Sequence, residues 1–155
     1  MFVRHQWYCA ALSREVEDAP VGRIFLNEPV VLETEYQTLK PDTALSMSLH
    51  LHTADEVHVL TSPSTSDAAW YMKPHPPGRY RTRCIIPAAL LNSGRYFVSL
   101  FLVEAAVNVV ARLNRFVVLE LIEDGQNRGG FLGEWHGVVR PSLNWATEPL
   151  GGDGN

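Results

Sequence analysis

Apolar and polar residues alternate with a period of two along most of this chain, and this pattern constrains its fold more than any other feature. The clearest case is the stretch 44–53, where four large apolar side chains alternate with serines and histidines. The apolar members are Leu45, Met47, Leu49 and Leu51. Successive side chains of a strand point to opposite faces, so this segment is predicted to be a strand with one buried face.

Turn-forming residues separate the alternating stretches at spacings of about ten residues. The predicted strands are Phe2–Leu12, Val30–Leu39, 44–53, Val57–Ser62, Arg79–Ile86, Arg95–Ala105, Val107–Leu113 and Arg115–Glu123. We interpret Val21–Pro29 as a connector, Pro63–Gly78 as a long loop and Pro87–Ser93 as a short helical turn. The pattern predicts an all-β protein, an antiparallel β-sandwich of about 7–9 strands.

Composition bounds the class of protein. The chain has 155 residues, 46% of them hydrophobic, which suits one folded domain rather than a disordered chain. A net charge of -4 without a basic run argues against nucleic acid as a partner. No apolar run approaches the length of about 20 residues that spans a bilayer, and Met1–Ala11 lacks the pattern of a signal peptide. We therefore expect no insertion into a membrane.

The two cysteines, Cys9 and Cys84, form neither a CxxC pair nor a zinc-binding spacing. We interpret them as reduced thiols of a cytosolic protein, and a single disulfide between them stays open as an alternative.

We expect the sandwich to occupy residues 1–124 and a C-terminal tail to occupy 125–155, with the last few residues disordered. The tail carries Trp135 and Trp145, whose indoles are large apolar groups that seldom stay in water without a partner. These two side chains are predicted to dock on the sandwich, on a second copy of the chain or on a ligand.

Several segments, taken in order, resemble one family. They are Asn27-Glu28-Pro29-Val30 followed by Glu35-Tyr36, Thr53-Ala54-Asp55-Glu56-Val57, Cys84-Ile85-Ile86-Pro87, Leu91-Asn92-Ser93-Gly94-Arg95-Tyr96, and the closing pattern of Trp135, Gly137, Val138, Val139, Arg140, Pro141, Leu143 and Trp145. Over roughly residues 2 to 145, the chain resembles the C-terminal carbohydrate-binding domain of Wzt-type ATP-binding proteins of polysaccharide (O-antigen) ABC exporters. It departs from that family at Glu56, where members often have glycine in the turn.

The resemblance implies an immunoglobulin-like sandwich that forms a homodimer. It also implies a place in the cytoplasm, at the inner face of the bacterial inner membrane, with the exporter's ATPase domain and permease as partners. The implied ligand is a lipid-linked polysaccharide such as the O-antigen of lipopolysaccharide. The chain has no GxxxxGK[ST] loop, so ATP hydrolysis of that kind would belong to another domain. The alternative is a structural sandwich that mediates dimerisation or subunit assembly without touching glycan.

Sugar rings combine apolar C–H faces with hydroxyl rims, so proteins meet them with aromatic planes and polar side chains. Trp70 and Tyr71, in the long loop, are candidates for the aromatic plane, unless one of them closes the end of the sandwich. His50 and His52 share the polar face of their strand and are candidates for a polar wall. Glu104 and Arg112 lie on neighbouring predicted strands, where they would contact sugar hydroxyls or pair with each other. A ligand role for Trp7 or Tyr8 is the weaker alternative.

Catalytic and metal-binding patterns are weak. The chain has no Gly-x-Ser-x-Gly elbow and no HExxH motif, so we expect no catalytic residue and no cofactor. Glu33 and Glu35 share a strand face, as a glycosidase pair might, but a solvated exterior explains them better. The imidazoles of His50, His52 and His58 could together bind a metal ion. A solvated polar face is the simpler interpretation, so no metal site is predicted.

Overall fold

A computed structural model describes residues 2–6, 20–39, 41–125, 128, 130–141 and 143–149. Within these ranges the chain forms nine strands and no helix. The strands are β1 (Phe2–Gln6), β2 (Pro20–Phe25), β3 (Val30–Thr38), β4 (Thr43–Thr53), β5 (His58–Pro63), β6 (Lys73–His75), β7 (Gly78–Ile86), β8 (Gly94–Glu104) and β9 (Asn108–Ile122). The prediction of an all-β protein is confirmed.

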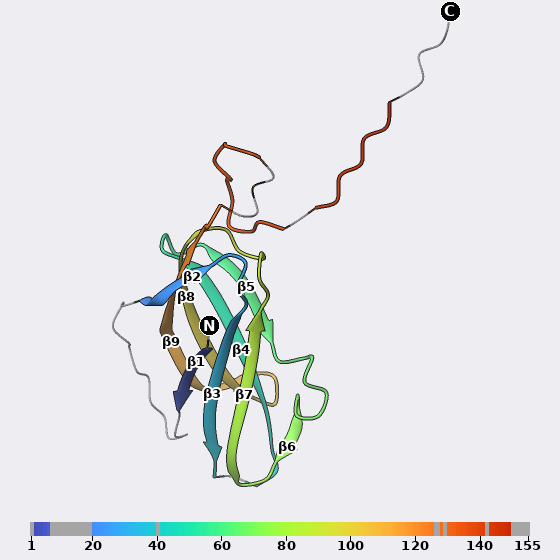
Figure 1. Ribbon diagram of the computed structural model, residues 1–155. Coiled ribbons are helices and arrows are strands. Elements are labelled where there is room, and N and C mark those ends of the chain that lie inside the picture. Colours follow the sequence, from blue (N-terminus) through green and yellow to red (C-terminus); the bar gives the residue numbers. More distant parts are fainter. Residues whose placement is uncertain are drawn as a thin grey trace, which may run out of the picture.

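The strands form two sheets that face each other (Figure 1). One has the order β1-β3-β7, and the other has the order β2-β9-β8-β4-β5 with β6 paired to β4. The pairings are antiparallel except for β1 with β3 and β2 with β9, which are parallel. The predicted sandwich is therefore confirmed, with two parallel pairings that the pattern did not indicate.

The core lies between the sheets, and the side chains that fill it are those that the alternation predicts. All four apolar residues of β4 are buried, and they meet the inward residues of β8 and β3. These are Tyr96, Val98, Leu100 and Leu102 from β8 and Val30, Leu32 and Tyr36 from β3. Burial of apolar surface at about 25 cal/mol per Å² is the main contribution that holds the two layers together.

The N-terminal part differs from the prediction in one place. The first part of the predicted connector Val21–Pro29 belongs instead to strand β2, which pairs with β9 at the border of the larger sheet. A short strand at the border of a sheet forms because it pairs with its one neighbour. It does not need a long alternation of apolar and polar residues, so its sequence pattern is weak. The predicted first strand is found at Phe2–Gln6, whereas Trp7, Tyr8, Cys9 and the rest of that prediction lie outside the described residues.

Three other predicted elements are corrected. Residues 87–93 form a turn and a single bridge from Leu91 to Val139 instead of a helical turn, because the tail supplies their backbone partners. The long loop 63–78 contains β6. The two strands predicted on either side of residue 114 are one strand, β9, whose pairing with β8 shifts register between Val98 and Leu100. Arg115 has a φ of 46° at this irregularity, which behaves as a bulge.

The turn between β4 and β5 shows how the departure at Glu56 is accommodated. Glu56 has a φ of 60°, a left-handed conformation that glycine adopts without cost and that other residues adopt at roughly 1 kcal/mol. Its backbone N–H donates to the carbonyl of Thr53 at 3.1 Å. Its carboxylate pairs with Arg115 at 2.8 Å. The left-handed position of this turn is therefore occupied by a glutamate that a backbone hydrogen bond and an ion pair hold in place.

The outward face of the smaller sheet carries a ladder of charges. Arg79, Arg81 and Arg83 of β7 pair with Glu33 and Glu35 of β3. The interpretation of both carboxylates as solvated is wrong for Glu33, which is 1% exposed and bound by Arg83 at 2.7 Å. The hydrogen bond from Arg81 lowers the pKa of Glu35.

Candidate functional site

A groove opens along one side of the sandwich, where β7 and β5 are the outer strands of their sheets. We call it the side groove. Its volume is about 580 Å³, and its floor consists of core residues of both sheets, Leu32, Met47, Leu49 and Leu100. Hydroxyl, carboxylate and guanidinium groups form the rim. These belong to Ser62, Ser64, Ser66, Asp67, Arg81, Thr82 and Arg83.

The segment after β5 forms one wall of the side groove and is anchored by two hydrogen bonds between Ser64 and Met47. The Ser64 hydroxyl accepts from the Met47 N–H at 3.1 Å, and the Ser64 N–H donates to the Met47 carbonyl at 2.8 Å. The Asp67 carbonyl then accepts the N–H groups of Trp70 and Tyr71 at 3.1 and 2.8 Å. This single turn carries the chain from Asp67, which lines the groove, to Trp70.

Trp70 packs on a cluster of rings at the same end of the sandwich. Its indole lies 5.0 Å from the ring of His75 and 5.3 Å, edge to face, from that of Tyr80. His75 is buried, and its Nδ1 lies 2.8 Å from the Lys73 carbonyl, so that nitrogen is the donor and Nε2 accepts from the Tyr36 hydroxyl at 3.2 Å. Burial, with smaller effects of Tyr80 and Asp67, raises the pKa of Tyr36 to about 12.

Trp70 is partly packed and partly exposed. One part of the indole covers the ring cluster, while 43% of the residue stays exposed. Tyr71 is half-buried and follows Trp70 in the same turn. An exposed indole offers an apolar plane, and the hydroxyl, carboxylate and guanidinium groups of the side groove offer polar partners, which are the two kinds of contact that a sugar needs.

A second cluster lies on the outward face of β4 and β5, and we call it the histidine row. It is a chain of four hydrogen-bond contacts between side chains. They join Ser48 to His50 (3.1 Å), His50 to Thr61 (3.3 Å), Thr61 to His58 (2.9 Å) and His58 to His52 (2.9 Å). Burial, and then the nearby His58 and His52, lowers the pKa of His50.

Arg112 lies on the same face as the histidine row. The ring of Phe101 is 4.3 Å from that of His50, and the Arg112 guanidinium carbon lies 5.5 Å from the same Phe101 ring. Three predicted residues, His50, His52 and Arg112, therefore lie on one face, away from Trp70 and Tyr71. Glu104 is the cross-strand partner of Asn108, whereas Arg112 is that of Phe101, so the predicted Glu104–Arg112 pairing is not a direct cross-strand one.

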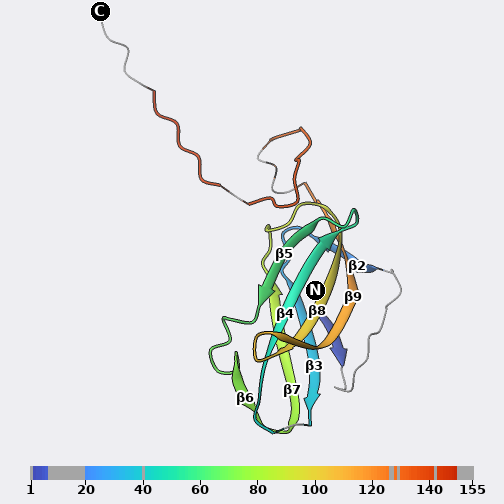
Figure 2. The ribbon, with the colours of Figure 1, turned by 180° about the vertical axis from the view of Figure 1, so that it is seen from behind.

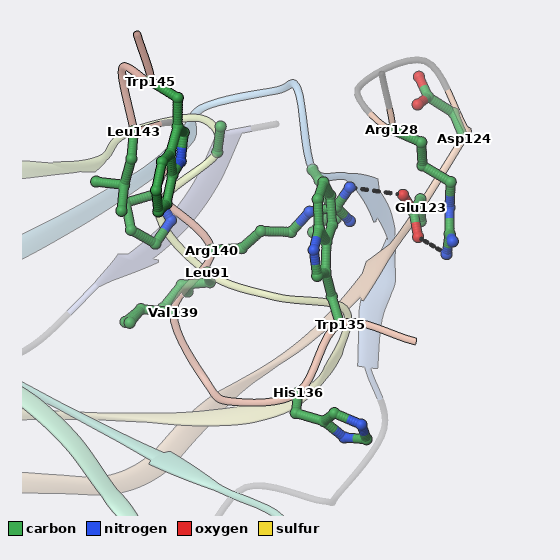
Figure 3. A pocket seen from close by; sticks show the side chains of 13 residues that line it. Leu91, Glu123, Asp124, Arg128, Trp135, His136, Val139, Arg140, Leu143 and Trp145 are labelled. Atoms are coloured by element: carbon green, nitrogen blue, oxygen red, sulfur yellow. Dashed lines mark hydrogen bonds and ion pairs between the residues drawn. The ribbon is translucent and has the colours of Figure 1, made fainter. Parts of the chain in front are cut away.

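An ion pair between Arg140 and Glu123 joins the tail to the end of the sandwich, and Trp135 lies beside it (Figure 3). The Arg140 guanidinium carbon lies 3.4 Å from the centre of this indole, and Phe131 stacks on it at 5.5 Å with an interplanar angle of 21°. Arg140 also pairs with Glu123 at 2.8 Å. Hydrogen bonds from Arg128 first, and then from Arg140, lower the pKa of Glu123. Trp135 is therefore held between two other residues of the tail, and Arg140 connects this group to the sandwich.

Asn92 fixes the backbone of this part of the tail, and we call its contacts the asparagine clamp. Its side-chain N–H groups donate to the carbonyls of Trp135 and Gly137 at 2.6 and 2.9 Å. Its backbone N–H donates to the Val138 carbonyl at 3.0 Å. The Tyr96 hydroxyl lies 2.9 and 3.1 Å from the carbonyls of Asn92 and Val138. Neither Asn92 nor Tyr96 is among the site residues predicted from the sequence, although both belong to a motif of the resemblance.

Residues 143–149 run away from the sandwich as an extended segment (Figures 1 and 2). Trp145 is 89% exposed there, and Leu143 is also exposed. Both border a hollow of about 960 Å³ between the tail and the end of the sandwich (Figure 3). The side chain of Trp145 is thus available to a partner, in contrast to that of Trp135.

The described residues contain neither a metal-binding group of three or more side chains nor a membrane-spanning helix. No group of three or more His, Cys, Asp or Glu side chains among them is arranged to hold a metal ion. None of the secondary structure in the described ranges is a helix long and apolar enough to cross a membrane.

Comparison with known proteins shows a likeness in fold. No protein-family model and no curated protein matches the sequence. Among solved structures, the chain is similar to one described as the crystal structure of the C-terminal domain of wzt. The TM-score is 0.64, the sequence identity is 11%, and the alignment covers 81% of this chain and 73% of that one. The expected resemblance is thus confirmed at the level of the fold.

Proposed function

We propose that this chain is a non-catalytic carbohydrate-binding domain that holds a bacterial surface polysaccharide, such as an O-antigen, for export by an ABC transporter. The observation that supports this function most directly is the side groove, together with the exposed Trp70 that follows its lining residue Asp67 by one turn. The likeness in fold to a Wzt C-terminal domain supports the setting. In that setting the domain works in the cytoplasm, at the inner face of the inner membrane, with the exporter's ATPase domain and permease.

The chemistry of the side groove suits a neutral, hydroxyl-rich ligand. Asp67 accepts hydrogen bonds from sugar hydroxyls, and the serine and threonine hydroxyls of the rim both donate and accept. Arg81 and Arg83 are already paired with carboxylates, so they offer their remaining N–H groups as donors rather than a free positive charge. The exposed part of Trp70 stacks on the C–H face of a sugar ring that extends beyond the groove.

Replacement of Trp70 with alanine is expected to weaken binding of a short oligosaccharide by about tenfold, which corresponds to the loss of roughly 1.4 kcal/mol of stacking. Trp70→Phe should keep part of the affinity. The measurement is calorimetric titration with oligosaccharides cut from a panel of bacterial O-polysaccharides, with millimolar to micromolar affinity expected for the native one. Asp67→Asn should also weaken binding, because it removes a charged acceptor.

The controls for this experiment lie elsewhere on the chain. Trp145→Ala removes an indole from the tail, and Asp55→Asn removes a carboxylate from the β4–β5 turn. Both should bind the short oligosaccharide like the unaltered chain, and thermal melting followed by circular dichroism checks that Trp70→Ala stays folded. Failure to bind any glycan of the panel, or full affinity in folded Trp70→Ala, would count against the proposal.

A second candidate function, assembly of two copies through the tail, is favoured by the exposure of Trp145 and Leu143. Large apolar side chains gathered on an exposed segment mark interaction sites. A homodimer would also place two side grooves on one export complex and raise the effective affinity for polysaccharide.

Removal of residues 141–155 tests this assembly, because the asparagine clamp and the contacts of Trp135 stay in place. We expect the full chain to be a dimer in light scattering coupled to size-exclusion chromatography, and the shortened chain to be a monomer. Trp145→Ala should also shift the protein from dimer toward monomer. A shortened chain that stays dimeric would place the interface elsewhere, and unchanged oligosaccharide affinity in the monomer would separate assembly from glycan binding.

A further inference from the structure

Two imidazole nitrogens in the histidine row are already at the separation of two ligands of one metal ion. His52 of β4 and His58 of β5 are cross-strand partners, and His52 Nε2 lies 2.9 Å from His58 Nδ1. Two nitrogens bound side by side to one ion, each at about 2.0–2.1 Å, lie about 2.8–3.4 Å apart. The contact is exposed, so both rings can turn their lone pairs toward a common point and an ion can enter from solvent.

Thr61 supplies the supporting contact that such a site needs. A histidine that binds a metal through one ring nitrogen usually donates the N–H of the other nitrogen to an acceptor, which fixes its tautomer. The second nitrogen of His58, Nε2, lies 2.9 Å from Thr61 Oγ1. With His58 Nδ1 on a metal ion, His58 Nε2–H donates to Thr61 Oγ1, and the Thr61 hydroxyl donates to His50 Nδ1, 3.3 Å away.

Water molecules would occupy the remaining coordination positions of the metal ion. No third His, Cys, Asp or Glu side chain among the described residues completes a ligand set. Arg115, the cation that reaches the adjoining turn, is paired with Glu56 at 2.8 Å. We infer that His52 and His58 together bind one first-row transition-metal ion, with Cu²⁺ bound more tightly than Ni²⁺ or Zn²⁺, as imidazole ligands generally prefer.

Calorimetric titration of the metal-free, untagged chain with Cu²⁺, Ni²⁺ and Zn²⁺ chlorides in a weakly coordinating buffer tests the inference. We expect one equivalent of Cu²⁺ to bind, reversibly on addition of a chelator. Affinity should fall by at least about tenfold in His52→Gln and in His58→Gln. His136→Gln removes an exposed tail histidine and should change nothing. Nuclear magnetic resonance should show Cu²⁺ broadening the ring signals of His52 and His58 first.

Thr61→Val separates a true metal site from loose association with surface histidines. It preserves the shape of the side chain and both imidazoles, so it should weaken Cu²⁺ binding only if the Thr61 hydroxyl orients His58. The absence of saturable Cu²⁺ binding would overturn the inference. Equal binding in folded His52→Gln and His58→Gln, or loss of binding in His136→Gln, would also overturn it. None of these three results would bear on the side groove, because the two sites share no residue.

Discussion

Replacing Asn92 with alanine is expected to free the tail from the end of the sandwich and to lower the free energy of unfolding by about 2–4 kcal/mol. The side chain is buried and satisfies the carbonyls of Trp135 and Gly137, while its own oxygen accepts from the Ser93 N–H at 2.9 Å. Alanine removes all three hydrogen bonds. Urea unfolding measures the stability, and hydrogen exchange at residues 135–140 reports release of the tail.

Two variants make this result specific to the asparagine clamp. Asn92→Asp keeps the acceptor oxygen but sets a carboxylate against two carbonyl oxygens, so it should release the tail at least as fully as alanine does. Asn108→Ala removes an exposed asparagine at the start of β9 and should leave stability within about 0.5 kcal/mol. Unchanged exchange at residues 135–140 in Asn92→Ala would show that other contacts suffice to hold the tail.

Replacing Leu51 with alanine is expected to cost about 3–5 kcal/mol of stability, the largest loss that we predict for one substitution. Leu51 is 0% exposed, and its strand lies between β5 and β8 in the middle of the larger sheet. The smaller side chain loses its transfer free energy and leaves a cavity that two rigid sheets cannot close. The midpoint and slope of urea unfolding measure the change.

Leu39→Ala is the matched control for Leu51→Ala. Leu39 follows β3 and is 68% exposed, so the same deletion there should change the free energy of unfolding by less than about 0.5 kcal/mol. Similar losses in both variants would mean that the buried face of β4 has been assigned to the wrong residues.

The buried faces of β3 and β4 could be predicted because each strand has one apolar side, and a period of two identifies that side without knowledge of the partner strand. Strand β2 could not be predicted, because its pairing with β9 is a contact between distant parts of the sequence. The burial of Glu33 was missed for the same reason, since the arginines that bind it come from another strand.

The candidate sites were predictable in part. The alternation placed His50 and His52 on one outward face, but the contact of His52 with His58 depends on the register shift between Leu51 and His52. The exposed loop position of Trp70 was foreseen, whereas the side groove was not. A groove arises where two sheet borders fail to meet, and no local pattern of residues encodes that arrangement.

The charged side chains of β7 restrict the kind of ligand that can bind in the side groove. Border strands with free backbone groups invite other strands to join them, and charged side chains are a common defence. Arg81 and Arg83 stand on β7 at the mouth of the groove, held in place by Glu33 and Glu35. Their bulk and charge discourage edge-to-edge aggregation and the addition of a foreign peptide strand, while a chain of hydroxylated rings needs no backbone pairing to bind there.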